Sequence, residues 1–390
     1  MSAWKSVPLH EVATIERNAV AAAEIENATI YVGLENIESG GKFVGVREVD
    51  EGELASNKFA FTDRHVLYGK LRPYLAKIAR PSFGGICSTD ILPVLAGEKL
   101  DRNYLAHFLL QPAMVAFANS RATGANLPRL SPRVLAEFRI PLPSFQEQRR
   151  IAEVLDRAEA LRAKRRAALA QLDSLTQSIF LDMFGDPAIN PKQLPRMDLG
   201  NIVVDGFQNG LYKHSSEYGS GTPILRIDAF YDGVVTRLDA LKRLRVSPAE
   251  LETYGLREGD VVINRVNSME YLGKSAIIPA LPEPVVFESN MMRFSVNHEI
   301  ALSSYVVAFL QSGFIKGQIG VAAKQAVNQA SINQKDVSGF RINVPPLPLQ
   351  QTFARRITAI EALKTTQRTA LAELDALFTS LQHRAFRGEL

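Results

Sequence analysis

A stretch of about 47 residues occurs twice in this chain, and the repeat constrains the fold more than any other feature. Residues 138–184 and 340–386 align without a gap at an offset of 202 (340 minus 138), and about 18 of the aligned positions are identical. Self-similarity at a period of roughly 20–50 residues indicates stacked repeats. Because the period here is far longer, the repeat predicts two copies of a unit made of a domain plus a long helix.

Each copy of the repeat is predicted to be a long helix. The first helix is expected to begin at Ser144, which forms a capping-box pattern with Glu147, and to end near Gly185, with Pro187 just beyond. The a positions of a heptad pattern hold Ile151, Ala158, Arg165, Leu172 and Ile179, and in the second copy Phe353, Ile360, Gln367, Leu374 and Leu381. The d positions hold Val154, Leu161, Ala168 and Leu175, and in the second copy Arg356, Leu363, Ala370 and Leu377.

Two interpretations of these helices are open. An amphipathic helix on a globular domain averages about 10–14 residues, whereas this pattern continues for four heptads in both copies. The length favours a coiled coil between the two helices. Arg165 and Gln367 stand at the same central a position, where a polar residue can fix the register.

The chain of 390 residues is long enough for two or more domains of about 100–200 residues each. Short apolar runs separated by glycine-rich turns give both globular parts a mixed α/β (α+β) character, and residues 101–120 have helical spacing. Residues 66–70 match 261–265, and residues 104–110 match 305–311. The predicted organisation is a first domain (1–143), a central helix (144–186), a second domain (187–345) and a C-terminal helix (346–390).

Composition restricts the class of protein. The single cysteine, Cys87, excludes a disulfide framework and predicts a cytoplasmic location. No segment approaches the length of about 20 apolar residues that a membrane span needs. A net charge of +4 and a pI near 9.0 permit nucleic-acid binding without arguing strongly for it.

No catalytic signature is found. Residues 272–275 resemble the end of a phosphate-binding loop, but Ser268 stands where that loop requires glycine. The six histidines are scattered, and no pair of carboxylates has a spacing that suggests acid–base chemistry. We therefore expect no intrinsic catalysis, no metal site and no bound cofactor.

Loops rich in basic, amide and aromatic residues remain as candidates for binding. Arg, Lys, Asn and Gln contact base edges in the major groove, and Lys and Arg also neutralise phosphates. A solvated surface loop is the alternative for any one of these residues. The candidate DNA-binding residues are Lys70, Arg72, Tyr74, Lys77, Arg121, Asn126, Arg129, Asn209, Tyr212, Lys213, Arg265, Asn267, Lys274, Lys324, Gln325 and Asn328.

The arrangement resembles the specificity subunit of type I restriction–modification systems, in which two target-recognition domains are each followed by a long helix. The resemblance covers essentially the whole chain. Its most specific elements are residues 138–152, 340–354, 70–77 and 122–131. The second copy departs from the pattern, since Leu349 replaces Glu147 and the counterpart of residues 70–75 is largely lost.

The resemblance implies a function. Such subunits read a bipartite DNA site, one half-site per domain, and recruit two methyltransferase (modification) subunits and the restriction (translocase-endonuclease) subunits. S-adenosylmethionine, and ATP with Mg²⁺ for restriction, are then expected in the partners. Two antiparallel helices of about 38 residues, about 57 Å long, would hold the domains at opposite ends about a pseudo-twofold axis. Two other functions stay open at this point, a coiled-coil scaffold that binds protein and a nuclease with an unrecognised site.

Overall fold

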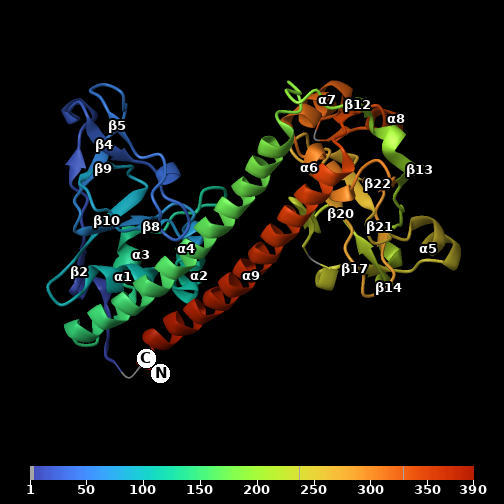
Figure 1. Ribbon diagram of the computed structural model, residues 1–390. Helices are drawn as coiled ribbons and strands as arrows, with labels where there is room; N and C mark the ends of the chain where they lie inside the picture. The colour runs from blue at the N-terminus through green and yellow to red at the C-terminus, as the bar shows by residue number, and fades with distance from the viewer. Residues whose placement is uncertain (1–3, 237, 328) are drawn as a thin grey trace. The chain divides into compact units, whose positions relative to one another are not determined.

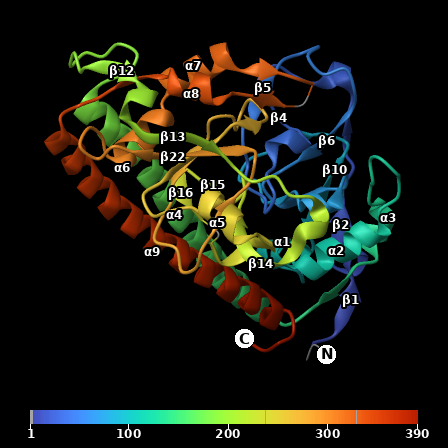
Figure 2. The same cartoon turned by 90° about the vertical axis from the view of Figure 1, so that its right-hand side faces the viewer.

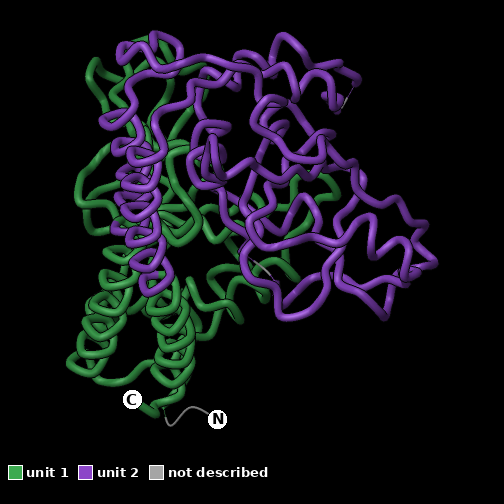
Figure 3. Tube along the Cα trace, turned by 45° about the vertical axis from the view of Figure 1, so that its right-hand side comes forward, with its two compact units in different colours: residues 1–167, 368–390 green, residues 168–367 purple. Residues whose placement is uncertain are grey.

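The structure is a computed structural model that describes residues 4–236, 238–327 and 329–390. It divides into two compact units, residues 1–167 with 368–390 (unit 1) and residues 168–367 (unit 2). Figure 3 shows that both long helices are shared between the units, so each unit contains one globular domain and a segment of each helix. In the described part of the chain, no helix is long and apolar enough to cross a membrane.

The two predicted long helices are confirmed. Helix α4 spans Phe145–Phe184 and helix α9 spans Leu347–Ala385 (Figure 1). Gly185 follows α4 with a φ of +78°, in the left-handed region that favours glycine after a helix. Only half of the predicted capping box forms, because the Glu147 amide donates to the Ser144 hydroxyl while the Glu147 carboxylate pairs with Arg150.

The helix segments run antiparallel within each unit. In unit 1 the start of α4 and the end of α9 share one apolar cluster, and further along α4 the Arg162 guanidinium pairs with Asp375 at 2.5 Å. In unit 2 the Lys364 ammonium on α9 pairs with Asp173 on α4 at 2.9 Å. At the offset of 202, Arg162 corresponds to Lys364 and Asp173 to Asp375. The same ion pair therefore occurs twice, with the roles of the helices exchanged.

The predicted heptad seam is correct near the helix ends at its a positions and wrong at the leucines of its d positions. Ile151 and Phe353 are fully buried, whereas Arg165, at the central a position, is exposed. The leucines at d are about half exposed, with exposed fractions of 52% for Leu161, 44% for Leu175, 54% for Leu363 and 51% for Leu377. The buried residues lie instead four positions after a, as at Leu155 and Lys364. Each helix packs on a globular domain as well as on the other helix, which turns its buried face toward that domain.

The globular domain of unit 1 is mixed α/β, as predicted. Its described strands form sheets of order β2-β10-β7-β8, β3-β6-β9-β4-β5 and β1-β11. The strands are β1 Ser6–Pro8, β2 Ala13–Ile15, β3 Ala19–Val20, β4 Thr29–Val32, β5 Arg47–Val49, β6 Lys58–Phe61, β7 His65–Gly69, β8 Ile78–Ala79, β9 Gly85–Cys87, β10 Ile91–Ala96 and β11 Arg139–Pro141. The short helices are α1 Arg102–Leu109, α2 Pro112–Arg121 and α3 Pro132–Ala136.

Residues 101–120, which the pattern predicted as one helical segment, form the two helices α1 and α2. Pro112 begins the second helix, because proline has no amide hydrogen to continue the first.

The globular domain of unit 2 is also mixed α/β. Its described strands form sheets of order β13-β22-β18-β20-β16-β15, β17-β14-β21, β19-β24-β23 and β12-β25. Figure 2 shows β13 and β22 side by side, as their antiparallel pairing requires. The strands are β12 Arg196–Asp198, β13 Val203–Asn209, β14 Tyr218–Leu225, β15 Phe230–Tyr231, β16 Gly233–Val235, β17 Lys242–Leu244, β18 Val261–Asn264, β19 Val266–Asn267, β20 Ser275–Ile277, β21 Val286–Phe287, β22 Met291–Val296, β23 Lys324–Gln325, β24 Ala330–Ser331 and β25 Arg341–Asn343. The short helices are α5 Pro248–Tyr254, α6 Ser303–Leu310, α7 Gly313–Ala322 and α8 Gln334–Ser338.

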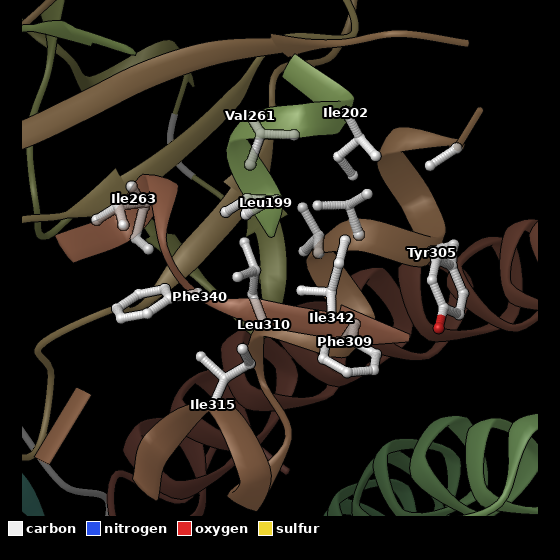
Figure 4. Packing of buried hydrophobic residues seen from close by; sticks show 14 of the residues in the cluster. Leu199, Ile202, Val261, Ile263, Tyr305, Phe309, Leu310, Ile315, Phe340 and Ile342 are labelled. Atoms are coloured by element: carbon white, nitrogen blue, oxygen red, sulfur yellow. The ribbon is translucent and has the colours of Figure 1, made fainter. Parts of the chain in front are cut away.

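A buried tyrosine occupies the same place in both units. The Tyr104 hydroxyl donates to the Pro141 carbonyl oxygen at 2.8 Å, and the Tyr305 hydroxyl donates to the Asn343 carbonyl oxygen at 2.5 Å. Phe386 packs on the ring of Tyr104, and its counterpart Phe184 packs on the ring of Tyr305. Figure 4 shows the unit 2 core, where side chains from β18, β25, α6 and α7 converge around Leu310. The same contact thus anchors the end of α4 to the domain of unit 2 and the residue after α9 to the domain of unit 1.

Candidate nucleic-acid interface

The first candidate loops of unit 1 are joined by backbone hydrogen bonds. Lys70, which directly follows β7, donates its amide to the Asp90 carbonyl oxygen at 2.9 Å. Its own carbonyl oxygen accepts from the Leu130 amide at 2.9 Å, and the Arg72 amide donates to the Pro128 carbonyl oxygen at 2.7 Å. The loop after β7 and the loop after α2 therefore form one framework, although about 60 residues separate them in the sequence.

Three charged side chains meet on this framework. Arg129 donates from Nε and Nη2 to the two carboxylate oxygens of Asp90, at 3.0 and 3.3 Å. The Lys70 ammonium lies 3.9 Å from the same carboxylate. The hydrogen bonds from Arg129 to Asp90 raise the pKa of the guanidinium. The cluster keeps a formal charge of +1, from two cations and one anion.

Arg72 and Tyr74 extend from the same loop into solvent. Arg72 has a φ of +51° and is exposed, and its guanidinium forms no hydrogen bond or ion pair within the described ranges. Tyr74 is 51% exposed. Lys77 differs, because its ammonium donates to the Leu34 carbonyl oxygen at 2.6 Å and so holds the loop.

The remaining candidates of unit 1 lie around the same loop. Arg121 ends α2, and its guanidinium lies over the ring of Phe117, 5.2 Å from the centroid. Asn126 is exposed between Thr123 and Arg129, which pair as an isolated bridge. Sequence reasoning did not select Asp90, because an acidic residue does not suggest DNA binding and its partner Arg129 is distant in the chain.

Unit 2 repeats this framework with other side chains. Arg265, which follows β18, donates its amide to the Asn290 carbonyl oxygen at 2.8 Å and accepts from the Ile332 amide at 2.9 Å. These bonds match those of Lys70, so Arg265 corresponds to Lys70 and Asn290 to Asp90. The β19-β24-β23 sheet then brings Asn267 beside a short hairpin. The two units thus share one backbone arrangement, which carries a different set of side chains in each unit.

The hairpin of unit 2 holds two exposed candidates, Lys324 and Gln325. Asn328 lies outside the described residues. The Asn267 side-chain oxygen accepts from the Ser268 amide at 2.8 Å. The structure thus brings Asn267, Lys324 and Gln325 together next to Arg265.

Ser289 links the segment after β13 to Arg265. The Ser289 amide donates to the Leu211 carbonyl oxygen at 3.0 Å, and the Ser289 carbonyl oxygen accepts from the Arg265 guanidinium at 3.0 Å. Asn209 lies two residues before Leu211, and Tyr212 directly follows it. Asn209 is half-buried and Tyr212 is 78% exposed.

Two lysines of unit 2 are held by intramolecular contacts. Lys213 pairs with Glu250 at 2.7 Å, and this contact raises the pKa of the lysine and lowers that of the carboxyl. Lys274 donates to the Ile227 carbonyl oxygen at 2.6 Å beside the ring of Tyr231, and burial lowers its pKa. Lys274 thereby performs the same structural task as Lys77 in unit 1.

One cluster in the described part of the chain has the composition of a metal site, namely His107, Asp156 and Glu159. His107 Nε2 lies 2.8 Å from the Asp156 carboxylate, and Arg80 donates to the same oxygen at 2.7 Å. The Arg80 guanidinium also lies 3.7 Å from Glu159. Burial acts to raise the pKa of Asp156, but the hydrogen bonds from His107 and Arg80 outweigh it, so the pKa is lowered. The arginine supplies the positive charge here, so the residues fit an internal ion network better than a metal.

The family can now be assigned. The sequence model of the type I restriction modification DNA specificity domain matches residues 1–171 and 198–376. The chain belongs to this family. As a specificity subunit it is the sequence-specific DNA-recognition component of a type I restriction–modification system, and it is non-catalytic.

Individual relatives agree with this assignment. The EcoKI specificity subunit of Escherichia coli K12 is 28% identical over 329 residues, which are 79% of this chain and 69% of that subunit. The EcoDI specificity subunit of Escherichia coli is 30% identical over 186 residues, which are 46% of this chain and 41% of that subunit. The solved S subunit from M. genitalium shares the fold, with a TM-score of 0.61 at 13% identity over 99% of this chain and 96% of that one.

Proposed function

We propose that the two loop frameworks are the DNA-reading surfaces, each recognising one half of a bipartite site. The observation that carries this proposal is the duplicated backbone arrangement, in which Lys70 and Arg265 make equivalent hydrogen bonds to Asp90 and Asn290. The same backbone framework places the loops of both units in the same way. Because the side chains on these loops differ, the two units recognise different base sequences. Two different half-sites follow from this arrangement.

The two long helices fix the spacing between the half-sites. Support comes from their continuity, since α4 and α9 each belong to both compact units without an interruption. A helix of 40 residues is about 60 Å long, which exceeds the ~34–36 Å that separates half-sites one helical turn apart.

Two modification subunits bind the chain, one on each unit. The support is a pair of half-exposed leucines on the helices of each unit, Leu161 with Leu377 in unit 1 and Leu175 with Leu363 in unit 2. Exposed apolar side chains that recur at equivalent positions are typical of a partner surface. The restriction subunits join this assembly, and S-adenosylmethionine, ATP and Mg²⁺ are bound by the partner subunits.

DNA binding by the loops is tested with Lys70→Ala and Arg72→Ala in the full chain, assembled with its modification subunits. Each phosphate contact releases about one counterion. The loss of one such contact in either variant is therefore expected to weaken binding to all duplexes and to lower the salt slope of the binding constant by about 1. The control is Arg64→Ala, which replaces an exposed arginine directly before the start of β7. If the salt slope is unchanged in both loop variants, this loop does not contact DNA.

A further inference from the structure

The carboxylate of Asp90 fixes the orientation of the Arg129 side chain. Both carboxylate oxygens accept from the guanidinium, one from Nε and one from Nη2. The Arg129 side chain is 45% exposed and Asp90 is 24% exposed. An arginine that solvent reaches is normally mobile, and the two parallel bonds reduce that freedom before any ligand binds.

The paired guanidinium keeps a free edge. Of the five N–H donors of an arginine, Asp90 takes one on Nε and one on Nη2. Among the described residues, both hydrogens of Nη1 and the outer hydrogen of Nη2 have no acceptor. Two of them point in parallel, which is the geometry that O6 and N7 of guanine accept in the major groove.

The charge near Arg129 distinguishes a base from a phosphate. A phosphate bound at Arg129 would lie close to the Asp90 carboxylate and would be repelled by it, whereas the edge of guanine is uncharged and presents acceptors. Arg72, on the same loop, has no carboxylate partner in the described ranges. The loop thus offers one arginine suited to a base and another suited to a phosphate.

We infer that Arg129 reads a guanine in the half-site bound by unit 1, and that Asp90 is its positioning residue. This inference rests on the proposed function of the loops. Unit 2 has no equivalent pair among its described residues, because Ser331 occupies the bridge position of Arg129 and Asn290 replaces Asp90. The guanine contact is therefore specific to one half-site.

The test uses the full chain assembled with its modification subunits, and it selects bound duplexes from a randomised DNA pool. The wild-type protein is expected to select a bipartite sequence with a G·C pair that it prefers by about 5- to 150-fold, the effect of one bidentate contact. In Arg129→Ala this preference is expected to fall to about 1 at that base pair, with the other half-site unchanged.

Asp90→Asn separates positioning from folding. Asparagine occupies the equivalent turn of unit 2, where Asn290 accepts the same backbone hydrogen bond. The variant is expected to lose part of the guanine preference while its binding to non-specific duplex at low salt becomes stronger, because a negative charge is removed. If Asp90 had only a structural role, the variant would lower both the guanine preference and the binding to non-specific duplex. Arg72→Ala is the matched control, expected to weaken all duplexes and leave the selected sequence unchanged.

Three results would overturn the inference. Arg129→Ala could weaken binding to all duplexes equally and leave the selected sequence of both half-sites unchanged, which would make Arg129 a phosphate contact. The wild-type protein could select a sequence whose G·C pairs all keep their preference in Arg129→Ala. It could also select no sequence at all, in which case the proposed function fails first and the inference fails with it.

Discussion

Gln148 ties the start of α4 to the globular domain of unit 1, and its replacement by leucine is expected to destabilise that unit. The side chain is fully buried. Its Nε2 donates to the carbonyl oxygens of Lys99 and Pro143, at 2.9 and 3.0 Å, and its Oε1 accepts from the Asp101 amide at 2.8 Å. Gln350 makes the same three kinds of contact in unit 2, with Ile300, Pro345 and Leu302.

The magnitude follows from these three bonds. Each contributes about 1 kcal/mol, and the partly buried Asp101 amide left unpaired costs about 1–2 kcal/mol more, so Gln148→Leu should lower the free energy of unfolding of unit 1 by about 4–5 kcal/mol. In a unit of this size, that corresponds to a decrease in Tm of about 10 °C. Gln146→Leu, at an exposed position two residues earlier, is expected to change stability by about 0.5 kcal/mol or less.

Hydrogen exchange measured by mass spectrometry resolves the two units. Gln148→Leu should speed exchange in peptides of unit 1, and Gln350→Leu should do so in peptides of unit 2. Gln148→Glu adds a pH test, because the new carboxyl would be buried facing two carbonyl oxygens. Its pKa would be raised, so the variant should be more stable at pH 4.5 than at pH 7.5, having lost stability as the pH rises through the folded-state pKa. Equal exchange in wild type and Gln148→Leu would refute the reasoning.

Two further predictions concern the helices. Leu161→Asp with Leu377→Asp should reduce the modification subunits bound per chain from two to one in native mass spectrometry, and a complex that keeps both would place the partner surface elsewhere. Inserting one heptad at the same level of α4 and α9 adds about 10 Å, so the methylated site should gain a spacer of about three base pairs at ~3.4 Å each. Methylation at the original spacing alone would contradict the role of the helices in spacing.

The sequence allowed the repeat, the long helices and the mixed α/β domains to be predicted, because each produces a periodic pattern within the chain. The contacts across the helix pair could not be predicted in the same way. Leu161 and Leu175 satisfy a heptad pattern yet lie half exposed, because the buried face also depends on the domain that packs on the helix. The exchanged ion pairs of Arg162 and Lys364 depend on a register that the heptad pattern does not specify.

The candidate site was predictable in outline. Lys70, Arg72 and Arg129 stand in two basic loops, and the structure joins these loops through backbone hydrogen bonds. The separate roles of these residues depend on their contacts in three dimensions, and the sequence pattern does not distinguish one loop lysine from another. Lys77 holds the loop through a carbonyl oxygen, and Asp90, which no basic pattern could indicate, orients Arg129.

Sequencing the methylated bases of a host that carries this chain with its modification subunits tests the central claim most directly. The account predicts methylation within one bipartite sequence, with two different half-sites separated by a non-specific spacer of fixed length. The claim that a duplicated scaffold carries two different reading surfaces would be contradicted by a continuous methylated sequence, by two identical half-sites, or by a spacer of variable length.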